Sequence, residues 1–194
     1  MLFRSKKRRS TVKCCLYRSH LHTGCKSGQQ PFDQWIFYWR GAWRSPITSA
    51  STSYLLRYSF DQIPKGQRIT HAEWVIPASG AAACTVHVWR VTAEWGIGAC
   101  HQYRMTWPKR LEWSVAGARG KSVDRATNPT GSGKFTPATP QLTINVTQDV
   151  ELWHSGASPN RGWLLTFDAA STILVSPTHT GRQQWQLRIT YEPE

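Results

Sequence analysis

The chain has 194 residues, of which 40% are hydrophobic, 12% aromatic and 18% charged. It contains no run of about 18 apolar residues, so no transmembrane helix is predicted, and its eleven tryptophans are too many for a disordered chain. Length and composition together predict one globular domain with a short extension.

The net charge of +13 is concentrated at the N-terminus. The first 30 residues hold eight basic residues and no acidic one, whereas the rest of the chain holds 16 basic and 11 acidic residues. All eleven tryptophans follow residue 34. We therefore expect a basic, disordered tail over residues 1–30 and a folded domain over residues 31–194.

Three interpretations of the tail remain open. It is a solvated extension without a role, an arm that attracts polyanions such as nucleic acid in a salt-sensitive way, or a metal site. The third interpretation rests on a Cys and His cluster whose spacing matches no usual zinc pattern: Cys14, Cys15, His20, His22 and Cys25. The basic start is not followed by an apolar stretch, so no signal peptide is recognisable.

The domain has the alternating pattern of β-strands. Strands are expected over residues 54–60, 69–76, 85–91, 142–146, 163–167, 172–175 and 185–191, with a candidate first strand at 33–36. One short helix is expected over residues 147–154, where Val150 and Trp153 share a face. The Gly- and Pro-rich residues 117–140 predict a long exposed loop. The fold class is all-β, an antiparallel β-sandwich of jelly-roll type.

Three sequence blocks in this order resemble the DNRLRE domain family. The first runs from LLRYSF at residue 55 through IPKG to ITHA at residue 69, and the second is VWRVTAEW at residue 88 followed by TW at residue 106. The third begins with NVT at residue 145 and ends at Leu165, and LRITY at residue 187 resembles the closing strand. The resemblance implies an extracellular jelly-roll module related to polysaccharide-binding modules.

The tryptophans divide into core and ligand-binding candidates. Trp95, Trp107 and Trp153 stand at family-motif positions and are expected in the core, as are Trp74 and Trp185 on apolar strand faces. Trp35, Trp39 and Trp43 form a strip of tryptophans spaced by four residues, with Arg40 and Arg44 beside them. This strip is either a platform for a glycan, flanked by guanidinium groups, or part of a first strand whose rings cover the sandwich. The ligand-binding candidates are Trp35, Trp39, Arg40, Trp43 and Arg44, with Trp89 and Trp113 as further ones.

No catalytic motif, cofactor motif or paired carboxylates are visible, so a non-enzyme without cofactor or metal is expected. Cys84 and Cys100 form either one disulfide or two thiols. The leading hypothesis is an extracellular or cell-surface module that binds polysaccharide, acidic polymers included, or serves as a structural part of a larger assembly. The alternative is polyanion or nucleic-acid binding through the basic tail.

Overall fold

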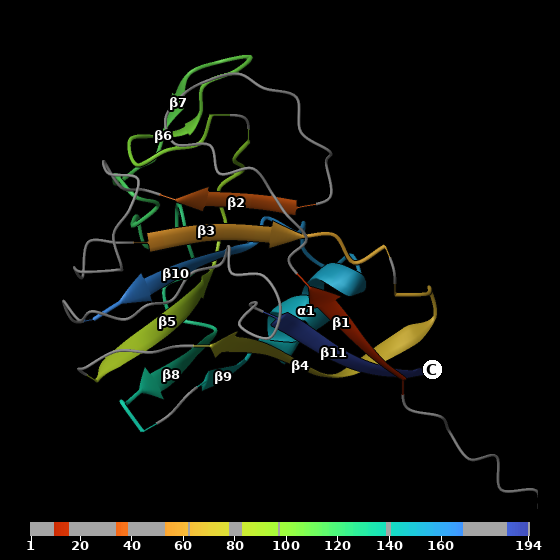
Figure 1. Cartoon of the computed structure of the whole chain (residues 1–194). Coiled ribbons are helices and arrows are strands. Elements are labelled where there is room, and N and C mark those ends of the chain that lie inside the picture. Colours follow the sequence, from red (N-terminus) through yellow and green to blue (C-terminus); the bar gives the residue numbers. More distant parts are fainter. Residues whose placement is uncertain are drawn as a thin grey trace, which may run out of the picture.

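The structure is a computed structural model that describes residues 10–15, 34–38, 53–61, 63–77, 83–96, 98–138, 141–168 and 186–193. For residues 10–15 and 34–38 it describes the backbone alone. The described elements are nearly all β-strands, arranged in two facing sheets with one helix (Figure 1). The part of the chain that the structure describes is therefore all-β, with a single short helix.

The four-stranded sheet has the order β1-β11-β4-β9. Its strands are β1 (Ser10–Cys15), β11 (Gln186–Pro193), β4 (Gln67–Pro77) and β9 (Gln141–Asn145). The five-stranded sheet has the order β2-β3-β10-β5-β8. Its strands are β2 (Gln34–Tyr38), β3 (Ser53–Tyr58), β10 (Trp163–Phe167), β5 (Cys84–Arg90) and β8 (Gly131–Phe135). All pairings within these two sheets are antiparallel.

Successive strands cross between the two sheets, from β3 to β4, β4 to β5, β8 to β9 and β10 to β11. This alternation is typical of a sandwich of jelly-roll type. The helix α1 (Thr147–His154) lies on the connection from β9 to β10 and coincides with the predicted helix. The remaining strands, β6 (Tyr103–Met105) and β7 (Leu111–Glu112), form a small hairpin of their own.

A large apolar cluster fills the space between the sheets. It is formed by alternate residues of the facing strands because every second side chain of a strand points to the same side. At its centre Trp74 of β4 meets Trp163 of β10 edge to face, with ring centroids 5.5 Å apart. Trp153 of α1 packs on Trp163 at 4.6 Å, which fixes the helix against the core. The predicted core positions of Trp74 and Trp153 are confirmed.

The five-stranded sheet is also covered on its outer face. Leu55 of β3 and Leu164 of β10 point away from the main core into a second cluster. This cluster is completed by residues from the segment that follows β5, namely Val91, Trp95, Ala99, Trp113 and Ala118. The predicted core position of Trp95 is therefore confirmed, in this second cluster.

The prediction of one long exposed loop over residues 117–140 is wrong. The stretch contains β8, which pairs with β5, and buried residues such as Ala118 and Asp124. Its glycines reflect close packing, because a Cβ at Gly131 would lie 2.5 Å from the Asn145 carbonyl oxygen. One at Gly133 would lie 2.9 Å from the Ile144 side chain. A glycine-rich strand looks like a loop when only the sequence is considered.

Part of the predicted tail forms a strand. Residues Ser10–Cys15 pair with β11 at the edge of the four-stranded sheet, from Ser10 opposite Tyr191 to Cys15 opposite Gln186. The rest of residues 1–30, including His20, His22 and Cys25, lies outside the described residues. The predicted strand at 172–175 and Trp185 also lie outside them. The candidate first strand at 33–36 corresponds to β2.

Candidate functional site

The tryptophan and arginine strip predicted as a ligand platform is described at one position only. The backbone of Trp35 lies in β2 opposite Arg57 of β3. Trp39, Arg40, Trp43 and Arg44 lie outside the described residues. The strip therefore stays a prediction from the sequence.

Trp113, a ligand-binding candidate from the sequence, is buried in the structure. Its side chain is 5% exposed and packs in the second cluster over the five-stranded sheet. Its indole Nε1 donates a hydrogen bond to the Cys100 carbonyl oxygen at 2.9 Å. Buried in this way, the ring anchors the segment it belongs to and offers no face to a ligand.

Trp89 has one ring face already occupied. The Arg125 guanidinium carbon lies 3.5 Å from the centre of the indole, and the indole Nε1 donates to Thr166 Oγ1 at 2.9 Å. Arg125 is itself buried, and burial lowers its pKa, with the positive charge of Arg119 as a further cause. One face of the Trp89 ring is thus engaged by a cation of its own chain.

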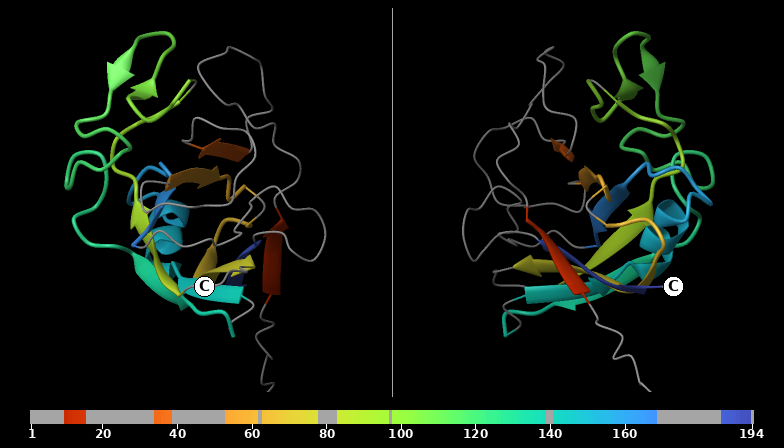
Figure 2. Two further views of the ribbon diagram at one scale, coloured as in Figure 1. Left: turned by 60° about the vertical axis from the view of Figure 1, so that its left-hand side comes forward. Right: turned by 90° about the vertical axis from the view of Figure 1, so that its right-hand side faces the viewer.

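Among the tryptophans whose side chains the structure describes, Trp107 is the exposed one. It was expected in the core, but 66% of its surface is accessible, more than for any other large apolar residue described. It lies between β6 and β7, in the turn of residues 106–110. Figure 2 shows this hairpin projecting from the end of the sandwich. The expectation failed because the ring is held on a hairpin that extends beyond both apolar clusters.

The hairpin that carries Trp107 also carries basic residues. Lys109 and Arg110 are exposed in the same turn, and Arg104 lies on β6. The Arg110 guanidinium carbon lies 5.1 Å from the centre of the Tyr103 ring, so this cation is held against the hairpin. Arg104 Nη1 donates to the Glu94 carbonyl oxygen at 2.7 Å. The turn therefore carries an exposed indole and two exposed basic residues, Lys109 and Arg110.

The base of the hairpin is fixed by backbone hydrogen bonds. The amide of Gly96 donates to Arg104 O at 3.0 Å, that of Cys100 to Tyr103 O at 2.7 Å, and that of Trp113 to Gln102 O at 3.2 Å. Gly98 adopts a φ of 76°, and a Cβ there would lie 1.7 Å from Thr106 Oγ1. This close approach requires glycine and holds the residue that precedes Trp107.

A buried carboxylate organises the loop that follows the hairpin. Asp124 is 1% exposed and accepts hydrogen bonds from the amides of Ser114, Val115 and Gly120 at 2.9, 3.0 and 3.0 Å. The Ser114 hydroxyl donates a fourth at 2.9 Å. Because this loop begins next to Trp113, Asp124 stabilises the support on which the hairpin is mounted.

An exposed indole beside cations is suited to stacking and charge contacts. An indole face packs on the C–H face of a sugar ring, and arginine or lysine contacts carboxylates or sulfates. A sequence signal for exposure was present: Pro108, Lys109 and Arg110 follow Trp107 directly, and proline with charged residues is typical of a surface turn.

Cys84 and Cys100 are not joined by a disulfide, since they pack in different clusters.

Over the described ranges, His, Cys, Asp and Glu side chains form no group of three placed to hold a metal ion. Among the same residues, no helix is both long and apolar enough to span a membrane. No family model matches the chain, and no curated protein matches it. The resemblance to the DNRLRE family stays a prediction from the sequence.

Proposed function

We propose that this protein is a non-catalytic, extracellular or cell-surface module that binds polysaccharide through the β6–β7 hairpin. The observation that carries the proposal is the two-thirds exposure of Trp107 beside Lys109 and Arg110. Exposing so large an apolar ring to water is unfavourable, and a ligand that stacks on the ring removes that surface from water. The neighbouring cations favour polymers with uronic or sulfated units.

The rigid support of the hairpin favours binding. Trp113 and Trp95 bury the base against the outer face of the five-stranded sheet, and Gly98 holds Thr106 in close contact. Because the base of the hairpin is fixed before a ligand binds, less conformational entropy is lost on binding, which favours affinity. Stacking makes this binding less sensitive to salt than binding by charge alone.

The basic tail supports the alternative function, polyanion or nucleic-acid binding. Its eight basic residues without an acidic one attract phosphates, and such binding weakens steeply with salt. The tail is best tested by replacing Lys6, Lys7, Arg8 and Arg9 with alanine in the full chain. Deleting residues 1–30 would also remove β1 from the sheet.

The test is retention of the full chain on neutral and acidic polysaccharides and on DNA, at low and high salt. Trp107→Ala is expected to abolish salt-resistant retention, and Trp107→Phe to keep part of it because phenylalanine still stacks. Val123→Ala, at another exposed apolar position, is the matched control and should bind like the natural chain. Unchanged retention of Trp107→Ala would overturn the proposal. Retention that is lost only with the tail variant would establish the alternative.

A further inference from the structure

The exposed large apolar side chains of the described residues lie close together in the sequence. They are Trp107, Val115 and Val123, which are 66%, 51% and 61% exposed. Trp107 belongs to the β6–β7 hairpin, whereas both valines belong to the loop that Asp124 organises. This loop, residues 114–125, is called the Asp124 loop below. Single exposed valines are common on protein surfaces, but two that one loop holds outward indicate a contact surface.

The Asp124 loop fixes the backbone at both valines. The Val115 amide donates to Asp124 Oδ2 at 3.0 Å, and the Val123 carbonyl oxygen accepts from the Thr92 hydroxyl at 2.9 Å. Ala118, which lies between the valines in the sequence, is fully buried in the second cluster. The loop thus turns its alanine inward and its valines outward, and this arrangement is present before any partner binds.

The exposed charges of the Asp124 loop are all positive. Arg119 and Lys121 are exposed, whereas the one acidic residue of the loop, Asp124, is 1% exposed and accepts hydrogen bonds from the loop itself. The Arg119 amide donates to the Val115 carbonyl oxygen at 3.1 Å, so these two residues belong to one turn. Lys121 stands two residues before Val123. The surface of the loop therefore combines apolar side chains with positive charge.

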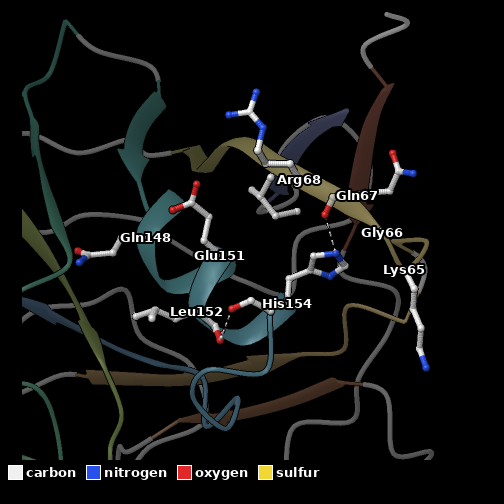
Figure 3. Close-up of a pocket in the computed structure, with 10 residues that line it drawn as sticks. Lys65, Gly66, Gln67, Arg68, Gln148, Glu151, Leu152 and His154 are labelled. Atoms are coloured by element: carbon white, nitrogen blue, oxygen red, sulfur yellow. Dashed lines mark hydrogen bonds between the residues drawn. The ribbon is translucent and has the colours of Figure 1, made fainter. Parts of the chain in front are cut away.

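The groove between the helix α1 and the start of β4 differs from the Asp124 loop in charge (Figure 3). Lys65 and Arg68 line it on the side of β4, and Glu151 lines it on the side of the helix. Arg68 is also ion-paired with Glu192. Basic and acidic side chains balance there, so the groove has little attraction for an anionic surface. Lys65 is therefore a suitable control for the cations of the loop.

An anionic lipid bilayer fits the Asp124 loop best. Apolar side chains enter the boundary between headgroups and acyl chains, and lysine or arginine beside them is attracted by anionic headgroups. A polysaccharide gains little from aliphatic side chains, which offer no ring for stacking. A nucleic acid is attracted by the charges alone and has no need of exposed valines. The apolar and basic groups together favour a membrane surface.

We infer that the Asp124 loop binds the surface of an anionic lipid bilayer. Val115 and Val123 insert at the level of the headgroups, and Arg119 and Lys121 contact the headgroups. Two valines and two cations give weak, reversible binding, which a second contact of the same molecule reinforces. The inference goes beyond the proposed function, since it concerns another ligand and does not need Trp107.

The experiment measures co-sedimentation of the full chain with vesicles of phosphatidylcholine, alone or mixed with phosphatidylserine, at low and high salt. Every chain carries the tail variant, so that the basic tail does not dominate the binding. We expect binding to the vesicles with phosphatidylserine and much less to those without it. Val115→Ser/Val123→Ser should weaken the binding about tenfold or more, because less apolar surface leaves water. Arg119→Ala and Lys121→Ala should each weaken it about fivefold.

Two further variants control for loss of fold and for unspecific charge. Lys65→Ala removes an exposed lysine outside the loop and should leave vesicle binding unchanged. Val123→Trp should tighten the binding, because tryptophan is favoured at the membrane interface, and a misfolded chain would not show this gain. Circular dichroism of each variant checks the fold.

Trp107→Ala separates this inference from the proposed function. It should lose retention on polysaccharide and keep vesicle binding, whereas Val115→Ser/Val123→Ser should do the opposite. The membrane inference is overturned, and the proposed function left standing, if vesicles with phosphatidylserine are not bound or if the loop variants bind them normally. Loss of vesicle binding in Trp107→Ala alone would move the contact to the hairpin and also overturn it. Equal binding to DNA, lost at high salt, would show that charge alone is responsible and that the valines have no part.

Discussion

Trp107 and Trp113 flank β7, and their environments are opposite: Trp107 is 66% exposed at the turn, whereas Trp113 is 5% exposed at the base. The buried ring donates to Cys100 and packs against the sheet, and the exposed ring faces solvent. One short hairpin thus holds both an anchor and a candidate contact residue. This division of roles leads to the first prediction.

Replacing each of these tryptophans with alanine should separate stability from binding. Trp113→Ala removes a buried aromatic ring and should lower the free energy of unfolding by about 3–5 kcal/mol. Trp107→Ala should change it by no more than about 0.5 kcal/mol, because the ring has little buried contact to lose. Urea denaturation of both variants measures the difference. Equal losses would mean that Trp107 is a structural residue.

Gly98→Ala should disturb the hairpin at the position of Thr106. The new Cβ would lie 1.7 Å from Thr106 Oγ1, at a backbone φ of 76° that alanine adopts with strain. We expect a loss of about 1–3 kcal/mol in stability and weaker retention on polysaccharide. The double variant Gly98→Ala/Thr106→Ala should recover part of both, since the clashing oxygen is gone. No recovery would show that the backbone conformation alone is responsible.

Asp124→Ala should loosen the loop that supports the hairpin. Three backbone amides and one hydroxyl would lose their acceptor, and three of these donors belong to Ser114 and Val115. The Gly120 donor is buried and would cost about 1–3 kcal/mol without its partner, whereas the part-buried donors of Ser114 and Val115 can turn to water, so a loss of about 1–3 kcal/mol is expected. Hydrogen exchange of the Ser114, Val115 and Gly120 amides should accelerate. Unchanged exchange at these amides would contradict the bonding scheme.

The buried carboxylate of Asp149 should make stability depend on pH. Burial raises its pKa, opposed by hydrogen bonds from Thr130 and Trp163 at 2.6 and 2.8 Å and by the charge of Arg90. The folded state then binds the proton more tightly than the unfolded state. Protonated Asp149 therefore makes its full contribution to folding stability below the ordinary aspartate pKa. This contribution is lost as the pH rises to the pKa that Asp149 has in the folded state.

Asp149→Asn tests this sign. From about pH 4 upward, the natural chain should lose stability relative to Asp149→Asn as the pH rises, measured by denaturant unfolding at each pH. Asp168 is a control of opposite sign. Although burial raises its pKa, hydrogen bonds from Thr85 and the charge of His87 lower it overall. The contribution of ionised Asp168 to folding stability is therefore present above the ordinary aspartate pKa and is lost as the pH falls to the lower pKa of the folded state. A constant difference between the natural chain and Asp149→Asn would contradict the prediction.

The regular elements could be predicted because local patterns determine them. The helix over residues 147–154 was predicted with its bounds, and alternation located most strands of both sheets. β8 was missed because Gly131 and Gly133 are typical of a loop in the sequence, whereas in the fold they allow close contact with β9. β1 was missed because it is stabilised by pairing with β11, which lies at the other end of the chain.

The candidate site could not be predicted in the same way. Pro108, Lys109 and Arg110 after Trp107 are a local signal for exposure, but whether Trp95, Trp107 and Trp113 are buried depends on what packs over them. Trp113 was a ligand-binding candidate from the sequence, but its segment folds back on the five-stranded sheet and the ring is buried. Trp107 was placed in the core by its motif position, although the hairpin carries it away from both clusters.

The sequence by itself determined the all-β class, the short helix and the core strands, because a two-residue or 3.6-residue period is a local consequence of burying one face. The tertiary structure alone decided which tryptophans are buried and that a groove forms between α1 and β4. It also decided that the segment after β5 covers the outer face of a sheet. These features depend on contacts between residues distant in the chain, and no local pattern encodes such contacts.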